Sequence, residues 1–146
     1  MRRITLAVLT LVVGLPLGVK AQETPQPKKY ADVAWYEVSY TKFKQGTHEK
    51  AERIIREHFI PVDIAVGRDV IPFDYSSGEW DHVVYFPIDG PADLEWRRSP
   101  LDVRWWATFV EQEGGADEAE ALMQSFDQLI VRRETHLARL YRYGEP

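Results

Sequence analysis

Two titratable side chains stand out because each lies in a stretch that is otherwise aromatic or aliphatic. Glu37 lies within VAWYEVSYTKF, and His82 begins HVVYFPI. Apolar surroundings shift the pKa of a carboxylate or an imidazole, which prepares such groups for proton transfer. The two are therefore candidate catalytic residues: His82 would transfer the proton, and Glu37 would orient the His82 ring or act as a second base. The structural alternatives are packing for His82 and an ion pair for Glu37, with Arg104, Arg132 or Arg133 as available partners.

Aromatic side chains could form the walls of such a site. Strand alternation places His82 on the face of Trp80, and the strands that carry Glu37 and His82 are expected to be neighbours. Packing in the core and in a subunit interface explains most aromatic residues, whereas any that line a cleft would suit a flat apolar ligand. The competing arrangement has Glu37 and His82 on opposite faces. The predicted cleft adds four ligand-binding candidates to Glu37 and His82: Tyr40, His58, Trp80 and Tyr85. A core role, bonded to a neighbour, is the alternative for His58.

Several kinds of chemistry have no support in the sequence. The chain has no cysteine, so disulfides, thiol catalysis and cysteine metal ligands are excluded. The histidines show no i, i+4 spacing on one helix, so no metal site and no cofactor are predicted. No phosphate-binding loop, dinucleotide glycine motif, nucleophile elbow or zinc-protease motif occurs. The four histidines are His48, His58, His82 and His136.

Residues 1–21 follow the secretory signal-peptide pattern. Two arginines precede an apolar run over residues 4–17, and Val19 and Ala21 occupy the −3 and −1 positions of a cleavage site. The run is shorter than the roughly 20 apolar residues of a membrane-spanning helix, although an uncleaved anchor is the alternative. We expect cleavage before Gln22, export to the periplasm or the medium, and no membrane anchor. Cleavage would change the formal charge from −5 to −8, which does not favour nucleic acid as a partner.

The rest of the chain is expected to be a flexible lead-in, residues 22–32, and a single α+β domain, residues 33–146. Alternating apolar residues predict a strand over residues 33–43. A helical stripe begins at Thr47, and Pro61 should end or kink that helix near Phe59.

A hairpin and a second helical region follow. Residues 69–75 and 81–88 predict two strands, the first at a sheet edge or bulged because it contains Pro72. Ser99 begins a helix as its N-cap, and residues 116–127 form a further helix. Residues 129–137 could continue that helix or form a strand, and we favour a strand because it completes the sheet.

The resulting order, β-α-β-β-α-β, is the ferredoxin-like arrangement of an antiparallel sheet with helices on one face. The opening Trp35-Tyr36-Glu37-Val38 and residues 78–84 (GEWDHVV) resemble the dimeric α/β-barrel superfamily. Residues 89–96 (DGPADLEW) resemble small exported bacterial proteins of unknown function. The resemblance implies the fold. The superfamily includes cofactor-free monooxygenases, haem-degrading and chlorite-dismutase-like enzymes and proteins without a known reaction, so no functional residue carries over.

Both faces of the predicted sheet are apolar, since Val83 and Tyr85 face one way and Val84 and Phe86 the other. One layer of helices covers one face, so a second subunit is expected on the other, which predicts a homodimer. Three functions stay open. The chain would bind a small apolar or aromatic ligand, act as a monooxygenase-like or haem-related enzyme, or serve as a protein-interaction module.

Overall fold

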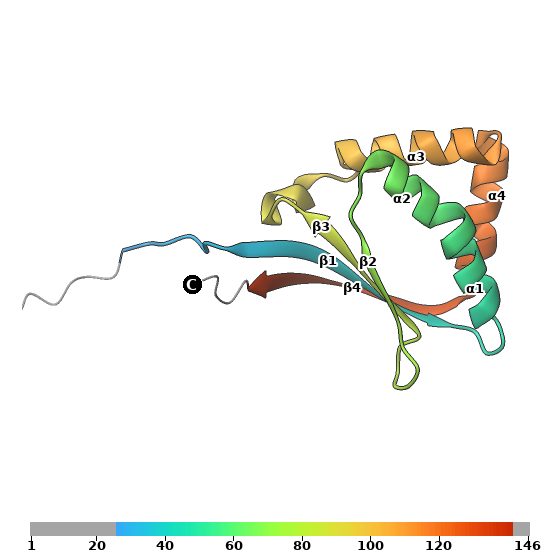
Figure 1. Ribbon diagram of the computed structural model, residues 1–146, viewed down its shortest axis with the longest axis horizontal. Helices are drawn as coiled ribbons and strands as arrows, with labels where there is room; N and C mark the ends of the chain where they lie inside the picture. The colour runs from blue at the N-terminus through green and yellow to red at the C-terminus, as the bar shows by residue number, and fades with distance from the viewer. Residues whose placement is uncertain (1–25, 142–146) are drawn as a thin grey trace, which may run out of the picture.

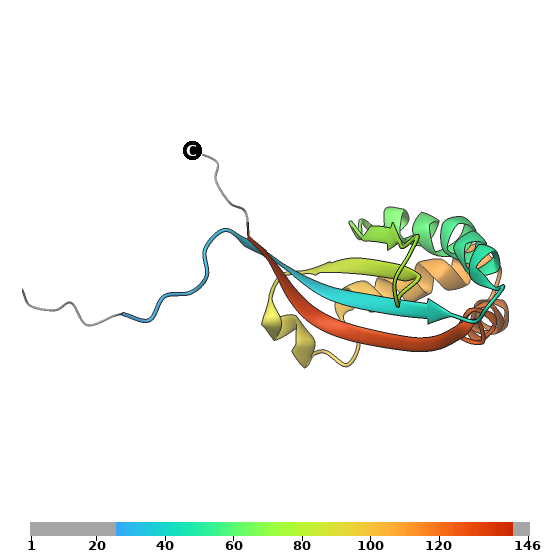
Figure 2. The same cartoon turned by 90° about the horizontal axis from the view of Figure 1, so that it is seen from below.

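The computed structural model describes residues 26–141. In this part of the chain, helices cover one face of a four-stranded antiparallel sheet (Figures 1 and 2). The predicted signal peptide and its cleavage site lie outside the described residues. No helix among residues 26–141 combines the length and the hydropathy that crossing a membrane requires.

The strand order in the sheet is β2-β3-β1-β4. The central strand β1 (Val33–Phe43) pairs with β3 (His82–Ile88) on one side and β4 (Ile130–Tyr141) on the other. The short strand β2 (Ile71–Asp74) pairs only with β3 and contains Pro72, which confirms the predicted edge position. The segment over residues 129–137, for which the sequence allowed either a helix or a strand, forms most of strand β4. The structure therefore confirms the ferredoxin-like α+β fold.

The first helical region continues past Pro61, which was expected to end or kink it. It consists of α1 (His48–Ile54), a π-helical turn η1 (Ile55–Phe59) and α2 (Ile60–Val66), which ends at Gly67 with φ 70°. Of the two predicted effects of Pro61, an end of the helix near Phe59 is wrong, and the helix is instead irregular at residues 55–59. In the π turn the Ile60 N–H donates to the Ile55 carbonyl, and Pro61 then occupies the first turn of α2, where its missing N–H is tolerated.

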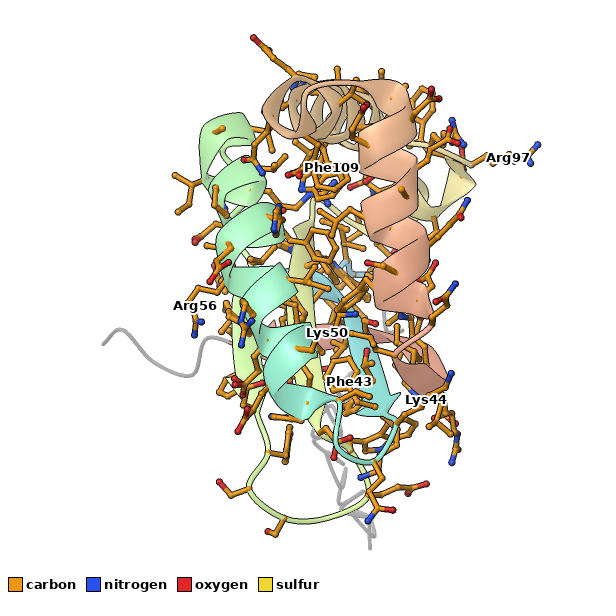
Figure 3. The ribbon with its side chains drawn as sticks, turned by 90° about the vertical axis from the view of Figure 1, so that its right-hand side faces the viewer. Phe43, Lys44, Lys50, Arg56, Arg97 and Phe109 are labelled. Carbon is orange, nitrogen blue, oxygen red and sulfur yellow. The ribbon has the colours of Figure 1, made fainter. Side chains whose placement is uncertain are left out.

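The second helical region consists of α3 (Pro100–Glu113) and α4 (Ala116–Asp127), preceded by a 3₁₀ turn η2 (Pro91–Glu95). The two helices run in clearly different directions (Figures 1 and 3). The predicted start of α3 is confirmed. The Ser99 hydroxyl accepts from the Asp102 N–H, and the Asp102 carboxylate accepts from the Ser99 N–H, so both form a capping box. Gly114 ends the helix with φ 87°, a conformation that favours glycine.

Two buried clusters hold these layers together. The first joins β1, α1 and α4, and the second joins α2, α3 and α4 away from the sheet. Phe43 marks the first and Phe109 the second in Figure 3. Phe59, on the π turn, packs against both clusters. The buried members are Phe43, Ala51, Ile54, Phe126 and Leu129 in the first cluster and Val62, Phe109 and Ala119 in the second.

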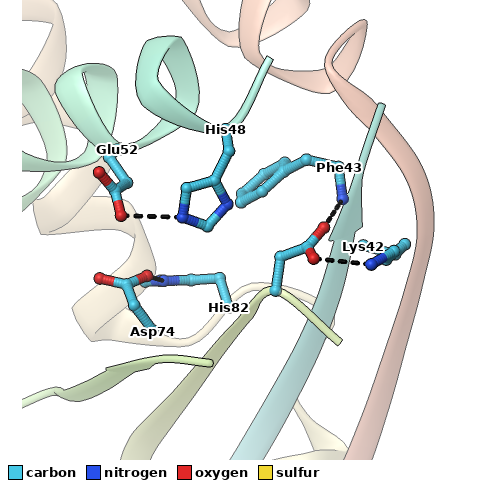
Figure 4. Close-up of polar contacts among 7 residues, drawn as sticks. Lys42, Phe43, His48, Glu52, Asp74 and His82 are labelled. Atoms are coloured by element: carbon cyan, nitrogen blue, oxygen red, sulfur yellow. Dashed lines mark hydrogen bonds and ion pairs between the residues drawn. The ribbon is translucent and has the colours of Figure 1, made fainter. Parts of the chain in front are cut away.

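Asp81 connects the start of β3 to the end of β1. Its carboxylate accepts from the Phe43 N–H at 2.8 Å and from Lys42 Nζ at 2.7 Å (Figure 4). Burial alone would raise the pKa of Asp81, but the hydrogen bonds and charge of its partners outweigh burial and lower the pKa below its ordinary value.

We predict that Asp81→Ala lowers the free energy of unfolding by about 1.5–3 kcal/mol at pH 7, as expected for lost hydrogen bonds to a charged group. Because the folded-state pKa is lowered, this stabilisation exists above the unfolded-state pKa and disappears as pH falls through the folded-state pKa. Urea unfolding at pH 7 and below pH 3 measures both values. The exposed Asp69→Ala variant is the control, and an Asp81→Ala effect of equal size at both pH values contradicts the assignment.

Candidate functional site

A cleft of about 420 Å³ lies between the helix-covered face of the sheet and the helices. Its floor comes from alternate residues of β1 and β3, because side chains at every second position share a face. Its opposite wall comes from the π turn, α2, α3 and α4, which contribute mainly apolar side chains. The floor includes Glu37, Ser39, Thr41, His82, Val84 and Phe86, and the wall includes Ile55, Phe59, Asp63, Trp105, Met123 and Phe126.

His82 is the most completely buried titratable side chain of the floor, with 5% of its surface exposed. Its Nδ1 lies 2.7 Å from Asp74 Oδ1, across the β2–β3 pair (Figure 4). A carboxylate only accepts hydrogen bonds, so in the neutral ring Nδ1 carries the proton and Nε2 is an acceptor. Nε2 is buried and has no hydrogen-bond partner among the described residues. The Asp74–His82 pair thus fixes the tautomer that can accept a proton or a hydrogen bond in the cleft.

Glu37 lies on the same face as His82, so the alternative of opposite faces is excluded. The two are not neighbours, however. Glu37 pairs with Phe86 and His82 with Thr41, which separates them by four strand positions, or about 13 Å. Within residues 26–141 the half-buried Glu37 carboxylate makes no hydrogen bond or ion pair, so the expected arginine partner is absent there. Asp74, and not Glu37, is the residue that orients His82.

Asp63 is a second buried acid in this cleft, on the α2 side. Its Oδ1 accepts from Trp105 Nε1 at 2.8 Å and lies 4.0 Å from Arg68 Nη1. Burial raises the pKa of Asp63, while the Arg68 charge and the Trp105 hydrogen bond oppose that increase. Asp63 therefore binds its proton more firmly than an aspartic acid in water does. It lies next to the Trp105 ring of the cleft wall.

Arg68 connects this acid to the start of α3. Its Nη2 donates to Asp102 Oδ1 at 2.5 Å, and its guanidinium lies 5.9 Å from the centre of the Phe86 ring. Burial would raise the pKa of Asp102, but hydrogen bonds from Ser99 and Arg68 outweigh it and lower that pKa. The Arg68 charge is thus shared between two acids, which leaves it poorly suited to bind an anionic ligand.

The cleft continues into a wider, more polar hollow of about 820 Å³. Glu37, Arg68 and Phe86 border both spaces. The outer hollow is lined by residues of the 3₁₀ turn, by Trp96, which follows that turn, and by the start of α3. Glu37 therefore lies at the passage between an apolar inner part and a polar outer part.

Three of the ligand-binding candidates lie on the opposite face of the sheet. The Tyr40 ring lies 5.7 Å from that of Trp80, and the Tyr85 ring lies 5.9 Å from that of Tyr36. Tyr40 and Tyr85 belong to the alternate positions of β1 and β3 that face away from the helices. Trp80 precedes the first residue of β3, so the strand alternation that linked it to His82 does not extend to it. These residues do not share a cleft with Glu37 and His82.

His58 also lies outside the cleft. It is on the π turn, and its Nδ1 lies 2.9 Å from Glu113 Oε1 of α3. The Glu113 pKa is lowered because hydrogen bonds from Gln112 and His58 outweigh the opposing effect of burial. This matches the alternative interpretation of His58 as a residue bonded to a neighbour.

Sequence reasoning missed Asp63, Arg68 and Asp74. Asp63 was not predicted because the helix was expected to end or kink near Phe59. Asp63 nevertheless follows Phe59 by four positions, so it lies on the same face of the helix as the apolar stripe. Asp74 was included in the predicted edge strand, and its pairing with His82 was detectable only from the hairpin register.

No protein-family model matches the sequence, and no curated protein matches it significantly. Among solved structures, the chain is similar to a NIPSNAP family protein with unknown function from Agrobacterium tumefaciens, with 12% identity and a TM-score of 0.55 over 80% of this chain and 96% of that chain. It is also similar to a NIPSNAP-like domain protein from Burkholderia xenovorans, with 18% identity and a TM-score of 0.50 over 80% and 92% of the two chains. At these identities the similarity shows a shared ferredoxin-like fold.

We predict that Asp63→Asn raises the melting temperature at pH 7. The raised folded-state pKa means that ionised Asp63 destabilises the fold, and asparagine removes the charge while it can still accept from Trp105. The gain should disappear below the unfolded-state pKa of about 3.9, where Asp63 is protonated in both states. Thermal unfolding monitored by circular dichroism at pH 7 and pH 3 measures this. A lower melting temperature at pH 7 contradicts it.

Proposed function

We propose that the inner cleft binds a small, largely apolar organic molecule that carries one hydrogen-bond donor, and that the donor binds His82 Nε2. The observation that carries this proposal is a buried acceptor without a partner in a cleft with mainly apolar walls. The volume, about 420 Å³, falls within the range of small-molecule sites.

The unpartnered Nε2 supplies the selectivity. A buried polar atom without a hydrogen bond costs about 1–3 kcal/mol, and a ligand donor placed there would remove that cost. A site of this kind discriminates strongly against an analogue that has the same apolar body and lacks the donor. The walls contribute the rings of Phe59 and Trp105, whose centroids lie 6.0 Å apart. Phe109, which is buried behind the wall, stacks on Trp105 at 5.0 Å.

Catalysis at the same place is the second candidate. Asp74 holds the His82 ring through Nδ1, which leaves Nε2 as a general base for the donor group of the ligand. A binding protein returns its ligand unchanged, whereas an enzyme converts it.

Export is part of this proposal and can be tested together with the ligand. The chain would be expressed with its own leader and purified from the periplasm under native conditions. We expect an intact mass that begins at Gln22 and a co-purifying small molecule, both visible by mass spectrometry. A product that retains residues 1–21 would contradict the export prediction, and conversion of the bound molecule on incubation would favour the enzyme.

The donor preference can be tested with matched probes. We predict that 2-naphthol quenches tryptophan fluorescence with at least about tenfold higher affinity than 2-methoxynaphthalene, and that His82→Gln abolishes this preference. His136→Gln, at an exposed histidine of β4, is the control. If His82→Gln lowers only the melting temperature and keeps the preference, His82 is structural and the proposed site is wrong.

The outer face of the sheet is proposed to bind a second copy of the chain. Tyr36, Tyr85 and Phe73 form a row of rings with centroids 5.7–5.9 Å apart, and the side chain of Phe73 is 50% exposed. Val38 and Val83 lie on the same face of the sheet and are buried. The resemblance to dimeric α/β-barrel proteins favours a two-fold contact between such faces over a different protein partner.

We predict a dimer in sedimentation experiments at micromolar concentration, which Phe73→Arg converts to a monomer because a charge would be buried at the contact. Ile64→Arg, at an exposed position of α2 (74% exposed), is the matched control and should remain dimeric. A wild-type monomer would contradict the homodimer and would leave this face available for another protein.

A further inference from the structure

Three side chains that commonly bind metal ions meet where α1 approaches the edge strand β2. His48 begins α1, Glu52 follows it by four positions, and Asp74 ends β2. Potential ligand atoms of these three residues all lie within 4.8 Å of one another. His48 Nε2 and Glu52 Oε1 are 2.9 Å apart (Figure 4). The spacing of the histidines in the sequence does not indicate this group, because the i, i+4 pair on α1 consists of a histidine and a glutamate.

We propose that His48, Glu52 and Asp74 bind a divalent zinc ion. One imidazole nitrogen and two carboxylate oxygens are ligands that zinc accepts, and three protein ligands leave a fourth position for water. The imidazole favours zinc over magnesium or calcium, which prefer oxygen ligands alone.

The distances require only small movements. In a tetrahedral zinc site, ligand bonds of about 2.1 Å place neighbouring ligand atoms about 3.4 Å apart. His48 Nε2 and Glu52 Oε1 would have to separate only slightly from 2.9 Å, with zinc replacing the proton between them. Asp74 lies on a short edge strand and its side chain is half exposed, so it is free to approach the other two.

A second, independent observation comes from His82. This residue is nine-tenths buried and lines a hollow of about 200 Å³ together with Glu52 and Asp74. Its Nδ1 donates to Asp74 Oδ1 at 2.7 Å, which orients the carboxylate and leaves its other oxygen free of that bond. Carboxylates that bind metal ions are usually held by an outer hydrogen bond of this kind.

The surrounding charges favour a cation. The group contains two carboxylates and one imidazole. Arg56 borders the same hollow, but its guanidinium is largely exposed and lies 3.8 Å from Glu57. Lys42 is paired with Asp81. No unpaired positive side chain among the described residues therefore lines this hollow.

The test is isothermal titration of zinc chloride into protein freed of metal by EDTA and dialysis. We expect one zinc ion per chain and at least about a tenfold loss of affinity in His48→Gln and in Asp74→Asn. His136→Gln is the matched control, because His136 lies 3.4 Å from Glu134 in an exposed pair without a third ligand, and it should bind zinc like the wild type.

Cobalt substitution checks the geometry. Cobalt(II) should produce visible absorption bands of a four-coordinate site in the wild type and in His136→Gln, but not in His48→Gln. Absence of a stoichiometric site, or an equal loss of affinity in the His136→Gln control, would overturn the proposal. The naphthol measurements are to be made with EDTA present, so their result does not depend on zinc. Absence of zinc binding would therefore not contradict the proposed cleft ligand, and absence of a naphthol preference would not contradict the zinc site.

Discussion

The arrangement depends on a chain of ring contacts between the sheet and the helices. The Phe126 ring lies 6.0 Å from that of Phe43 on β1 and 5.0 Å from that of Phe59 on the π turn, and Phe59 lies 5.7 Å from Phe109. Edge-to-face contacts of this kind add to the free energy gained from burying the rings. They fasten the helices to one end of the sheet, whereas the second cluster joins the helices to each other. The cleft lies between the sheet and the helices that these contacts hold in place.

The polar groups of the cleft owe their properties to those apolar walls. His82 and Asp63 are buried by the layers that the aromatic contacts hold together, and each is held by one specific partner, Asp74 for the imidazole and Trp105 for the carboxylate. If these groups were exposed to water, Asp74 would fix the tautomer of His82 less firmly. Asp63 would also bind its proton less firmly, because burial is what raises its pKa. Truncation of Phe126 would therefore affect the site as well as stability.

Strand and helix order could be predicted because alternation and capping are local properties. Ser99 correctly marked the start of α3. Alternation left open whether Glu37 and His82 share a face, and the pairing of β1 with β3 shows that they do. The site required the register, which no local pattern specifies. Registration of β1 against β3 separates Glu37 from His82, and registration of β2 against β3 supplies Asp74 instead. The π turn lets the helix continue past Pro61, and the sequence pattern did not predict this turn. Asp63, which follows the turn, was therefore not predicted as a residue of the site.

The central claim is that Asp74 accepts a hydrogen bond from His82 Nδ1 and leaves Nε2 as an acceptor for a ligand in the cleft. Nitrogen-15 NMR of the histidine side chains at neutral pH reports the tautomer of each ring directly. The account predicts a protonated Nδ1 and an unprotonated Nε2 for His82, with a shift of the Nε2 resonance when 2-naphthol is added. A His82 ring that carries its proton on Nε2, or an Nε2 resonance that does not respond to the probe, would contradict it.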